Sequence, residues 1–408
     1  MVVGFLPGYL LLVGLAKGNG VSFKKIIFIS KKGVKRTSGV IWILFLVGFL
    51  LPSWYLAGTI DQMVSVALHF ITPQHFFTLS FVVAIIFSMI LGTSVGTLSS
   101  IGIPIMGSAI ALHIPVEIVA GALISGAFVG DRTSPFSSAH QLLAQTVEIT
   151  VKQQFRAMGV TSMLAILSGI FFYSFLDNRL LNEIHNQVSV NRISLSFWEF
   201  IPPMILILMV IMRIKVLYAF LCSIVFACLL AMWNGVGLLK LILSLWYGIT
   251  GLGGGLKNMY LLLLFLGLAG AYNGLLEELK VIQSILDRWL QTSYTIFSDT
   301  LKIMVTTLGI TLIAANQTLP IILTGRSFLE YWSSKYSKEE LARVMADSTM
   351  LFPGIVPWSV LTIMCSTITG VSIFDYFSYA IFLWILPIFT ICLSVIKMNR
   401  QKGILKTS

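Results

Sequence analysis

A series of long apolar stretches restricts this chain to a membrane fold. Residues 101–129, for example, are interrupted only by Pro104, His113, Pro115 and Glu117. An α-helix needs about 20 apolar residues to cross a bilayer. Only 11% of the residues are charged, against about 25% in soluble domains. The sequence therefore predicts an all-α polytopic membrane protein without a soluble domain.

The apolar stretches predict about 11–12 membrane segments, some of them short, broken or re-entrant. The N-terminal stretch is expected to be a membrane segment rather than a signal peptide, because no basic region precedes it. A multi-pass protein of the cell membrane, in bacteria the cytoplasmic membrane, is the expected setting. The expected segments are 2–16, 39–60, 76–92, 101–129 (a pair or a re-entrant hairpin), 157–176, 201–213, 215–233, 258–275, 303–325, 354–371 and 377–396.

Basic residues in the short connecting segments predict the topology. Residues 17–36 hold seven Lys and Arg residues and no acid, so the positive-inside rule makes this segment cytoplasmic. The segment 61–75 has Asp61 and neither Lys nor Arg, which predicts the outer side. Within the basic segment, 23–29 is also apolar, and this pattern predicts an amphipathic helix on the inner leaflet. The net charge of +11 therefore indicates membrane topology rather than nucleic-acid binding.

Metal-ligand and nucleophile patterns are absent from the sequence. The cysteines Cys222, Cys228, Cys365 and Cys392 all lie in apolar stretches without ligand spacing. The five histidines are scattered, and no nucleophile-elbow motif occurs. We expect no transition-metal site, no cofactor and no enzymatic activity.

Polar motifs recur in the two halves of the chain and indicate an internal repeat. In the first half, two apolar segments precede a polar motif at 92–97 (GTSVGT) and then a motif around Asp131. In the second half, two apolar segments precede 314–318 (AANQT) and then a motif around Asp347. Any polytopic chain looks periodic when its segments are similar, but matched polar motifs favour a repeat. The predicted repeats are 1–200 and 201–408, in inverted topology, which would place a substrate site on broken helices at their interface.

Asp131 is the first candidate for chemistry. The preceding stretches 121–125 and 126–130 carry Gly or Ser at both ends, a pattern that lets helices pack closely. Residues 133–135 (TSP) predict a helix break that leaves carbonyls free to coordinate a cation. An alternative is an ion pair between Asp131 and Arg132 at a membrane surface. Ionisable residues inside membranes are costly and usually functional, so we predict that Asp131 binds an ion.

Asp347 is the candidate in the second half. Pro353 and Pro357 follow it and predict a broken element. The alternative is a soluble-looking helix that starts at Ser337 as N-cap, with Glu340 three residues later, and that has Asp347 at its polar end. The repeat favours an ion-binding role for Asp347.

Uncharged oxygen donors accompany both acids in apolar surroundings. Isolated Ser and Thr residues in membrane helices often bond only their own backbone. Clusters at corresponding positions of a repeat, with an Asn-Gln pair that needs several partners, favour an ion-binding role instead. The expected ligands are Thr93, Ser94, Thr97, Ser134, Asn316, Gln317 and Ser348.

At these motifs the chain resembles the NhaC family of sodium/proton antiporters. The resemblance covers most of the chain and is densest at 92–102, 119–135, 317–328 and 347–358. It implies exchange of sodium for protons, with both ions as transported ligands. In some relatives it implies exchange of organic acids or amino acids coupled to those ions.

The chain departs from the family pattern at Ser138, Asn316 and Ala346, where acids are common. Fewer carboxylates leave the ion and the stoichiometry open. The predicted function is a secondary transporter that exchanges sodium or another monovalent cation for protons by alternating access. One alternative is an ion-coupled exchanger of organic acids or amino acids, with Arg326 holding a carboxylate. The other is an inactive membrane paralogue. A homodimer is a further expectation.

Overall fold

The computed structural model describes residues 2–62, 75–180, 197–212, 214–249, 255–279 and 295–407. Within these ranges every regular element is helical, so the all-α prediction is confirmed. Most of the segment 61–75, predicted to lie outside the cell, falls beyond the described residues. The helices are α1 (Val2–Gly18), α2 (Phe23–Leu56), α4 (Phe76–Leu91), α5 (Ser94–Thr97), α6 (Ile103–Ala111), α7 (Val116–Thr133), α8 (Ser138–Val147), α9 (Val151–Leu180), α10 (Ile201–Ile211), α11 (Val216–Trp233), α12 (Leu238–Tyr247), α13 (Leu256–Glu278), α15 (Ile296–Ala314), α16 (Thr318–Ser333), α17 (Lys338–Ala346), α18 (Val360–Thr369), α19 (Ile373–Tyr376) and α20 (Ile381–Thr407).

Several of these helices have the length and composition of membrane spans. Within the described ranges, five are long and apolar enough, and a sixth span forms if α18 and the segment 373–379 count as one element bent by 86°. Shorter apolar helices include α4, α10, α11 and α12. The expected hairpin at 101–129 is present as α6, a short turn and α7. The predicted multi-pass architecture is confirmed, with many of its segments broken or short.

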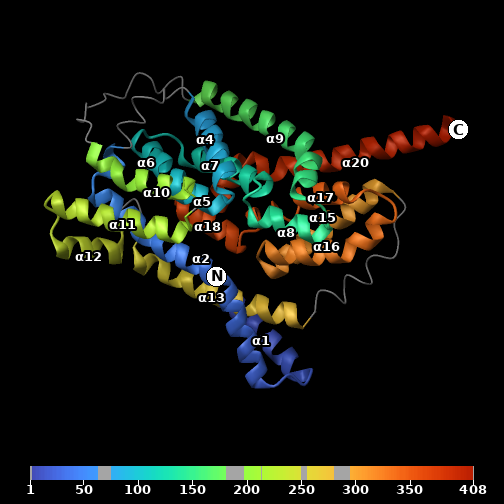
Figure 1. Cartoon of the computed structure of the whole chain (residues 1–408), viewed down its shortest axis with the longest axis horizontal. Helices are drawn as coiled ribbons and strands as arrows, with labels where there is room; N and C mark the ends of the chain where they lie inside the picture. Colours follow the sequence, from blue (N-terminus) through green and yellow to red (C-terminus); the bar gives the residue numbers. More distant parts are fainter. Residues whose placement is uncertain are drawn as a thin grey trace.

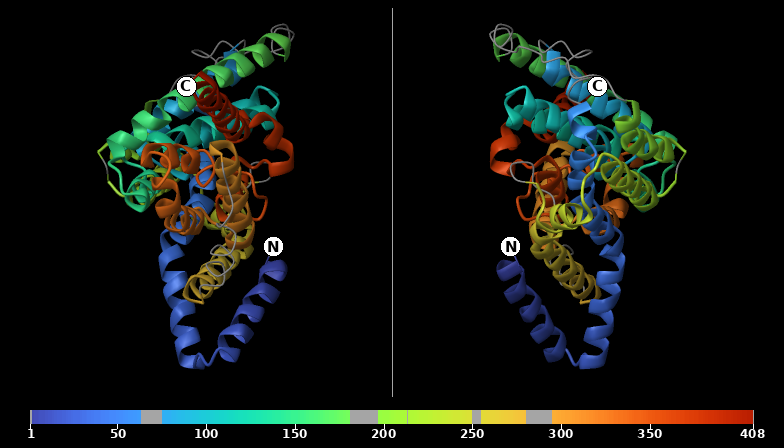
Figure 2. Two further views of the ribbon diagram at one scale, coloured as in Figure 1. Left: turned by 90° about the vertical axis from the view of Figure 1, so that its right-hand side faces the viewer. Right: turned by 90° about the vertical axis from the view of Figure 1, so that its left-hand side faces the viewer.

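The basic N-terminal segment differs from the prediction. Residues 23–29 do not form a separate helix on the membrane surface; they are the first turns of α2, which continues for 34 residues. The Ser22 hydroxyl caps this helix by accepting the backbone N–H of Lys25. Nothing interrupts the backbone between the basic and apolar parts, so the two join into one helix. Figure 2 shows α1 and the start of α2 projecting from the rest of the molecule beside α13.

Two groups of helices build the molecule. In one group, α2 packs against α11 and α13, and α10 packs against α11. In the other group, α8 and α9 of the first half pack against α16 and α17 of the second half, and α20 packs against α7. In Figure 1, α2 and α10–α13 lie on one side, and α8 with α15–α17 lies on the other.

Small residues allow α4 and α7 to approach closely, as the sequence predicts. A Cβ atom on Gly130 would lie 2.1 Å from the carbonyl carbon of Ser88, and one on Gly126 would lie 2.5 Å from the carbonyl oxygen of Phe81. The Ser88 hydroxyl donates to the Gly126 carbonyl (2.8 Å) and accepts the Gly130 N–H (3.0 Å). This contact fixes the C-terminal end of α7, which carries Asp131.

Two helices break at the polar motifs. The first break separates α4 from α5 at Gly92, which is left-handed (φ 68°), and Thr93, which is extended. The second break separates α15 from α16 at Ala315, which is also left-handed (φ 51°), followed by Asn316 and Gln317. Each half of the chain thus contains a helix that is broken at its polar motif. The inverted repeat and its boundaries at 1–200 and 201–408 stay predictions.

Candidate functional site

The two helix breaks line one cavity of about 360 Å³. Its wall on one side comes from the two breaks with the adjoining turns of α5 and α16, from Asp131 of α7, from one residue of α8 and from part of α18. The opposite wall comes from α2 and α13. Polar lining residues at the breaks are Thr93, Ser94, Asp131, Ser138, Asn316, Gln317 and Thr318.

Asp131 lies at the meeting point of the two breaks and is only 7% exposed. One carboxylate oxygen, Oδ2, accepts a hydrogen bond from the Gln317 amide (3.1 Å) and a long one from the Ser94 hydroxyl (3.4 Å). Ser94 belongs to the first break and Gln317 to the second. Among the described residues, no basic side chain forms an ion pair with this carboxylate. The acid is therefore buried with polar but uncharged partners.

The first break has a local cause in Gly92. Glycine adopts φ 68° without strain. A Cβ atom at this position would also lie 2.6 Å from the carbonyl carbon of Phe136 and 2.7 Å from the nitrogen of Ser137. The chain after Asp131 therefore packs directly on the break. This contact brings Ser94 and Asp131 to the same place.

The second break is held by its two amide side chains. Asn316 Oδ1 accepts the backbone N–H of Leu319 (2.9 Å), which caps the start of α16, and its Nδ2 donates to the Ala314 carbonyl (3.2 Å). Gln317 Nε2 donates to the Met350 carbonyl (3.2 Å) as well as to Asp131. The break thus offers an amide to Asp131, while its side chains also pair with the Ala314 carbonyl and the Leu319 N–H.

Three of the predicted hydroxyl ligands do not line the cavity, and each donates to a backbone carbonyl. Thr97 donates to Thr93 O (2.8 Å), and Ser348 donates to Val344 O (2.8 Å), each within its own helical segment. Ser134 donates to Met89 O (2.7 Å) and ties the end of α7 to α4. Of the expected ligands, the structure brings together Thr93, Ser94, Asp131, Asn316 and Gln317, but not Thr97, Ser134, Asp347 or Ser348. Ion binding by any of them stays a prediction.

At the break after α7, the carbonyls of Gly130, Asp131 and Arg132 all have hydrogen-bond partners. The Asp131 carbonyl accepts the Ser137 hydroxyl (2.5 Å), and the Arg132 carbonyl lies 2.7 Å from His140 Nδ1. The Gly130 carbonyl accepts the Ser134 N–H. For these three carbonyls the expectation of free cation ligands is not met, because they are buried and buried carbonyls are almost always paired.

Asp347 lies in a separate buried cluster with Arg132. It is the C-cap of α17, whose N-cap is Ser337, as the alternative interpretation predicted. Its carboxylate forms an ion pair with the Arg132 guanidinium and accepts a hydrogen bond from the Thr390 hydroxyl. The predicted alternative for Asp131, a pair with its neighbour Arg132, is therefore wrong: Arg132 pairs with Asp347 instead.

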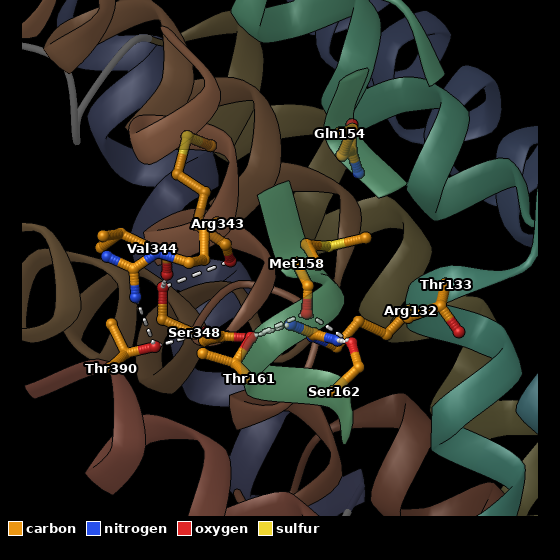
Figure 3. Close-up of polar contacts among 12 residues, drawn as sticks. Arg132, Thr133, Gln154, Met158, Thr161, Ser162, Arg343, Val344, Ser348 and Thr390 are labelled. Atoms are coloured by element: carbon orange, nitrogen blue, oxygen red, sulfur yellow. Dashed lines mark hydrogen bonds and ion pairs between the residues drawn. The ribbon is translucent and has the colours of Figure 1, made fainter. Parts of the chain in front are cut away.

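The guanidinium of Arg132 is fully buried. It also donates to Ser162 (2.6 Å) and Thr161 (3.0 Å) of α9. Figure 3 shows it directed toward these hydroxyls, with Arg343 and Thr390 on the far side of the cluster. The cluster joins the end of α7 to α9, α17 and α20.

Sequence reasoning missed the opposite wall of the cavity. Arg36 and Thr37 of α2 and Asn273 and Glu277 of α13 line it. Asn273 and Glu277 are four residues apart, so they lie on one face of their helix. A polar face in an otherwise apolar segment is the signal that was available. Arg326 is exposed and does not line the cavity.

Residues 142–398 match the Na+/H+ antiporter family. The chain is 25% identical to the Na+/H+ antiporter NhaC of Bacillus subtilis over 387 residues, 90% of this chain and 85% of that protein. It is 27% identical to the malate-2H+/Na+-lactate antiporter of the same organism over 391 residues, 90% of this chain and 82% of that one. It is 23% identical to NhaC of Alkalihalophilus pseudofirmus over 386 residues, 88% and 82% of the two chains. The resemblance is confirmed, and the chain belongs to the Na+/H+ antiporter family.

Proposed function

We propose that this multi-pass cell-membrane protein exchanges sodium ions for protons, with Asp131 as the group that binds either ion. The observation that carries the proposal is the position of Asp131: a buried carboxylate in the cavity, at the junction of two broken helices, without a basic partner in the described chain. Relatives named as Na+/H+ antiporters support it.

The chemistry follows from the cost of burying a charge. An isolated carboxylate inside a protein is unfavourable unless it is neutralised or paired. Asp131 can meet this requirement by taking a proton or by binding a cation. Because each occupant removes the need for the other, the two compete for one carboxylate. Competition at a single site couples the transport of one ion to that of the other, and no second binding site is needed for this coupling.

The surrounding groups suit a small monovalent cation. Na⁺ is a hard cation and prefers several oxygen ligands, as other hard cations do. Thr93, Ser94, Asn316 and Gln317, which carry hydroxyl and amide oxygens, line the same cavity as the carboxylate. Alternating access would follow if the group of helices that carries Asp131 moves against α2 and α13.

Inverted membrane vesicles with an acid interior test this proposal. Addition of Na⁺, Li⁺ or K⁺ to the wild type is expected to release internal protons, monitored with a pH-sensitive dye. Asp131→Asn keeps the size of the side chain but removes the charge, and it is expected to abolish the release. Asp61→Asn, a change outside the cavity lining, is the matched control. Normal exchange by Asp131→Asn would refute the assignment of this site.

A second candidate is exchange of organic acids. It is favoured by one observation: the guanidinium of Arg36 lies in the cavity wall, where it could meet a carboxylate. The relative named as a malate-2H+/Na+-lactate antiporter supports it. Release of protons by malate or lactate, but by no inorganic cation, would favour this candidate. A protein inert toward every solute would favour the inactive paralogue.

A further inference from the structure

Close packing of α2 on α13 brings two charged residues to the cavity wall. A Cβ atom on Gly33 would lie 2.2 Å from the Gly270 carbonyl oxygen and 3.2 Å from the Cα of Gly274. Only glycine permits this approach of the two backbones. One turn further along each helix, Arg36 and Glu277 form an ion pair. Both side chains line the cavity that contains Asp131.

Exposure changes along this cavity. The side chains of Arg36 and Glu277 are 56% and 42% exposed, whereas Asp131 is 7% exposed. The ion pair therefore lies near the solvent-accessible end of the cavity, and Asp131 lies in its interior. By the positive-inside rule, the basic segment that contains Arg36 places this end on the cytoplasmic side.

Asn273 lies one turn before Glu277 on the same face of α13. Its Oδ1 atom is buried and has no hydrogen-bond partner in the described part of the chain. A buried acceptor without a partner is rare and costs free energy. An amide oxygen in a polar cavity, next to a carboxylate, is suited to receive a cation.

We propose that Glu277 and Asn273 form an entry subsite for a monovalent cation on its way to Asp131. In this subsite Arg36 acts as a tethered cation that the arriving ion displaces from Glu277. The inference rests on the proposed cation exchange. It adds a second, more exposed binding position for the same ion. Neither Glu277 nor Asn273 is among the ligands that the sequence predicts.

Glu277 and Arg36 act on an entering cation through their charges. A carboxylate at the mouth of a cavity raises the local concentration of cations and thereby lowers the KM for an entering ion. Arg36 opposes this effect because its positive charge neutralises Glu277. Since the pair is half-exposed, water and salt screen its charges, and the effect is modest.

A neighbouring pair provides a matched control. Glu278 forms an ion pair with Lys25 at 3.5 Å, with similar exposures of 48% and 58%. Neither Glu278 nor Lys25 lines the cavity. Glu278→Gln therefore removes the same charge from the next residue of the same helix, outside the proposed path.

The experiment measures the KM for Na⁺ in inverted vesicles, where the cytoplasmic face is outside. Glu277→Gln is expected to raise the KM about threefold without a change in the maximal rate, because exposed charge pairs have effects of this size. Arg36→Gln frees Glu277 and is expected to lower the KM about twofold. Glu277→Asp keeps the charge and Glu278→Gln lies outside the path, so both are expected to keep the wild-type KM.

Ionic strength supplies a second readout, which a purely structural role would not affect. An impermeant salt such as choline chloride screens surface charges, so the difference between Glu277→Gln and the wild type should shrink as this salt is added. The inference is overturned if Glu277→Gln and Glu278→Gln behave alike, or if Glu277→Gln lowers the maximal rate at unchanged KM. Neither of those results would contradict ion binding by Asp131. Normal exchange by Asp131→Asn would refute the Asp131 site, but it would not remove a KM shift in Glu277→Gln, so the two failures can be told apart.

Discussion

The guanidinium of Arg132 and the carboxylate of Asp347 form an ion pair in which both side chains are fully buried. The two residues come from different halves of the chain and join α7 to the end of α17. Arg132 directly follows Asp131, so its pairing with Asp347 keeps a positive charge away from the cavity. Asp131 is left as a buried acid without a basic partner among the described residues.

Removal of one partner from this pair is expected to destabilise the protein. Asp347→Asn leaves Arg132 buried without a counter-charge, at a cost of about 3–5 kcal/mol. The melting temperature of the detergent-purified protein measures this loss. The double substitution Arg132→Met with Asp347→Leu is expected to recover most of it, because hydrophobic pairs often replace buried ion pairs at little cost. A variant Asp347→Asn that melts like the wild type but does not exchange would instead support ion binding by Asp347.

Gln317 is expected to contribute to exchange through its hydrogen bond to Asp131. Gln317→Ala removes a donor to a carboxylate, a bond of about 1.5–3 kcal/mol. We expect kcat/KM for Na⁺ to fall roughly tenfold in the vesicle assay. Gln141→Ala is the control, since Gln141 donates from an exposed position to the Pro135 carbonyl. Equal activity of the two variants would contradict a role for Gln317 at the site.

Two substitutions of Asn316 test separately its structural role at the second break and its role in ion exchange. Asn316→Asp keeps the oxygen that accepts the Leu319 N–H and adds an acid to the cavity. We expect the melting temperature to fall somewhat, because the ionised carboxylate cannot donate to the Ala314 carbonyl, and the number of protons exchanged per sodium, measured from the reversal potential in proteoliposomes, to rise. Asn316→Ala loses the cap, and a stability loss of about 1 kcal/mol is expected. An unchanged stoichiometry in Asn316→Asp would show that an acid at this position takes no proton during transport.

Gly92 is expected to tolerate no side chain. Gly92→Ala would place a Cβ atom 2.6 Å from the Phe136 carbonyl carbon and strain a left-handed residue by about 1–2 kcal/mol. We expect a lower melting temperature and a large loss of exchange, since Ser94 and Asp131 depend on this contact. Gly309→Ala, in α15 with open space around it, is the control and is expected to be neutral or slightly stabilising. Full exchange by Gly92→Ala would mean that the break adapts without its glycine.

Local sequence was sufficient to predict much of this architecture. Apolar stretches of membrane length require helices, because lipid cannot satisfy free backbone groups. The small residues around Gly126 and Gly130 indicated a close contact with another helix, since only such residues let backbones meet; the structure shows that this helix is α4. The same local logic placed the N-cap at Ser337. The polar motifs 92–97 and 314–318 coincide with the two observed breaks, but the expected span 303–325 runs through the second one and is wrong there, because Ala315 is left-handed and ends α15.

Partner choice was decided only by the tertiary structure. Asp131 and Asp347 look equivalent in sequence, yet one faces the cavity with Ser94 and Gln317 and the other accepts Arg132. The sequence by itself determined that this is an all-helical membrane protein with two polar motifs, each followed by an acid. Only packing between distant helices decided that Asp131 stays without a counter-charge in the described part of the chain and that Glu277 lines the same cavity. The physical reason is that a charge is neutralised by whichever group the fold brings near it.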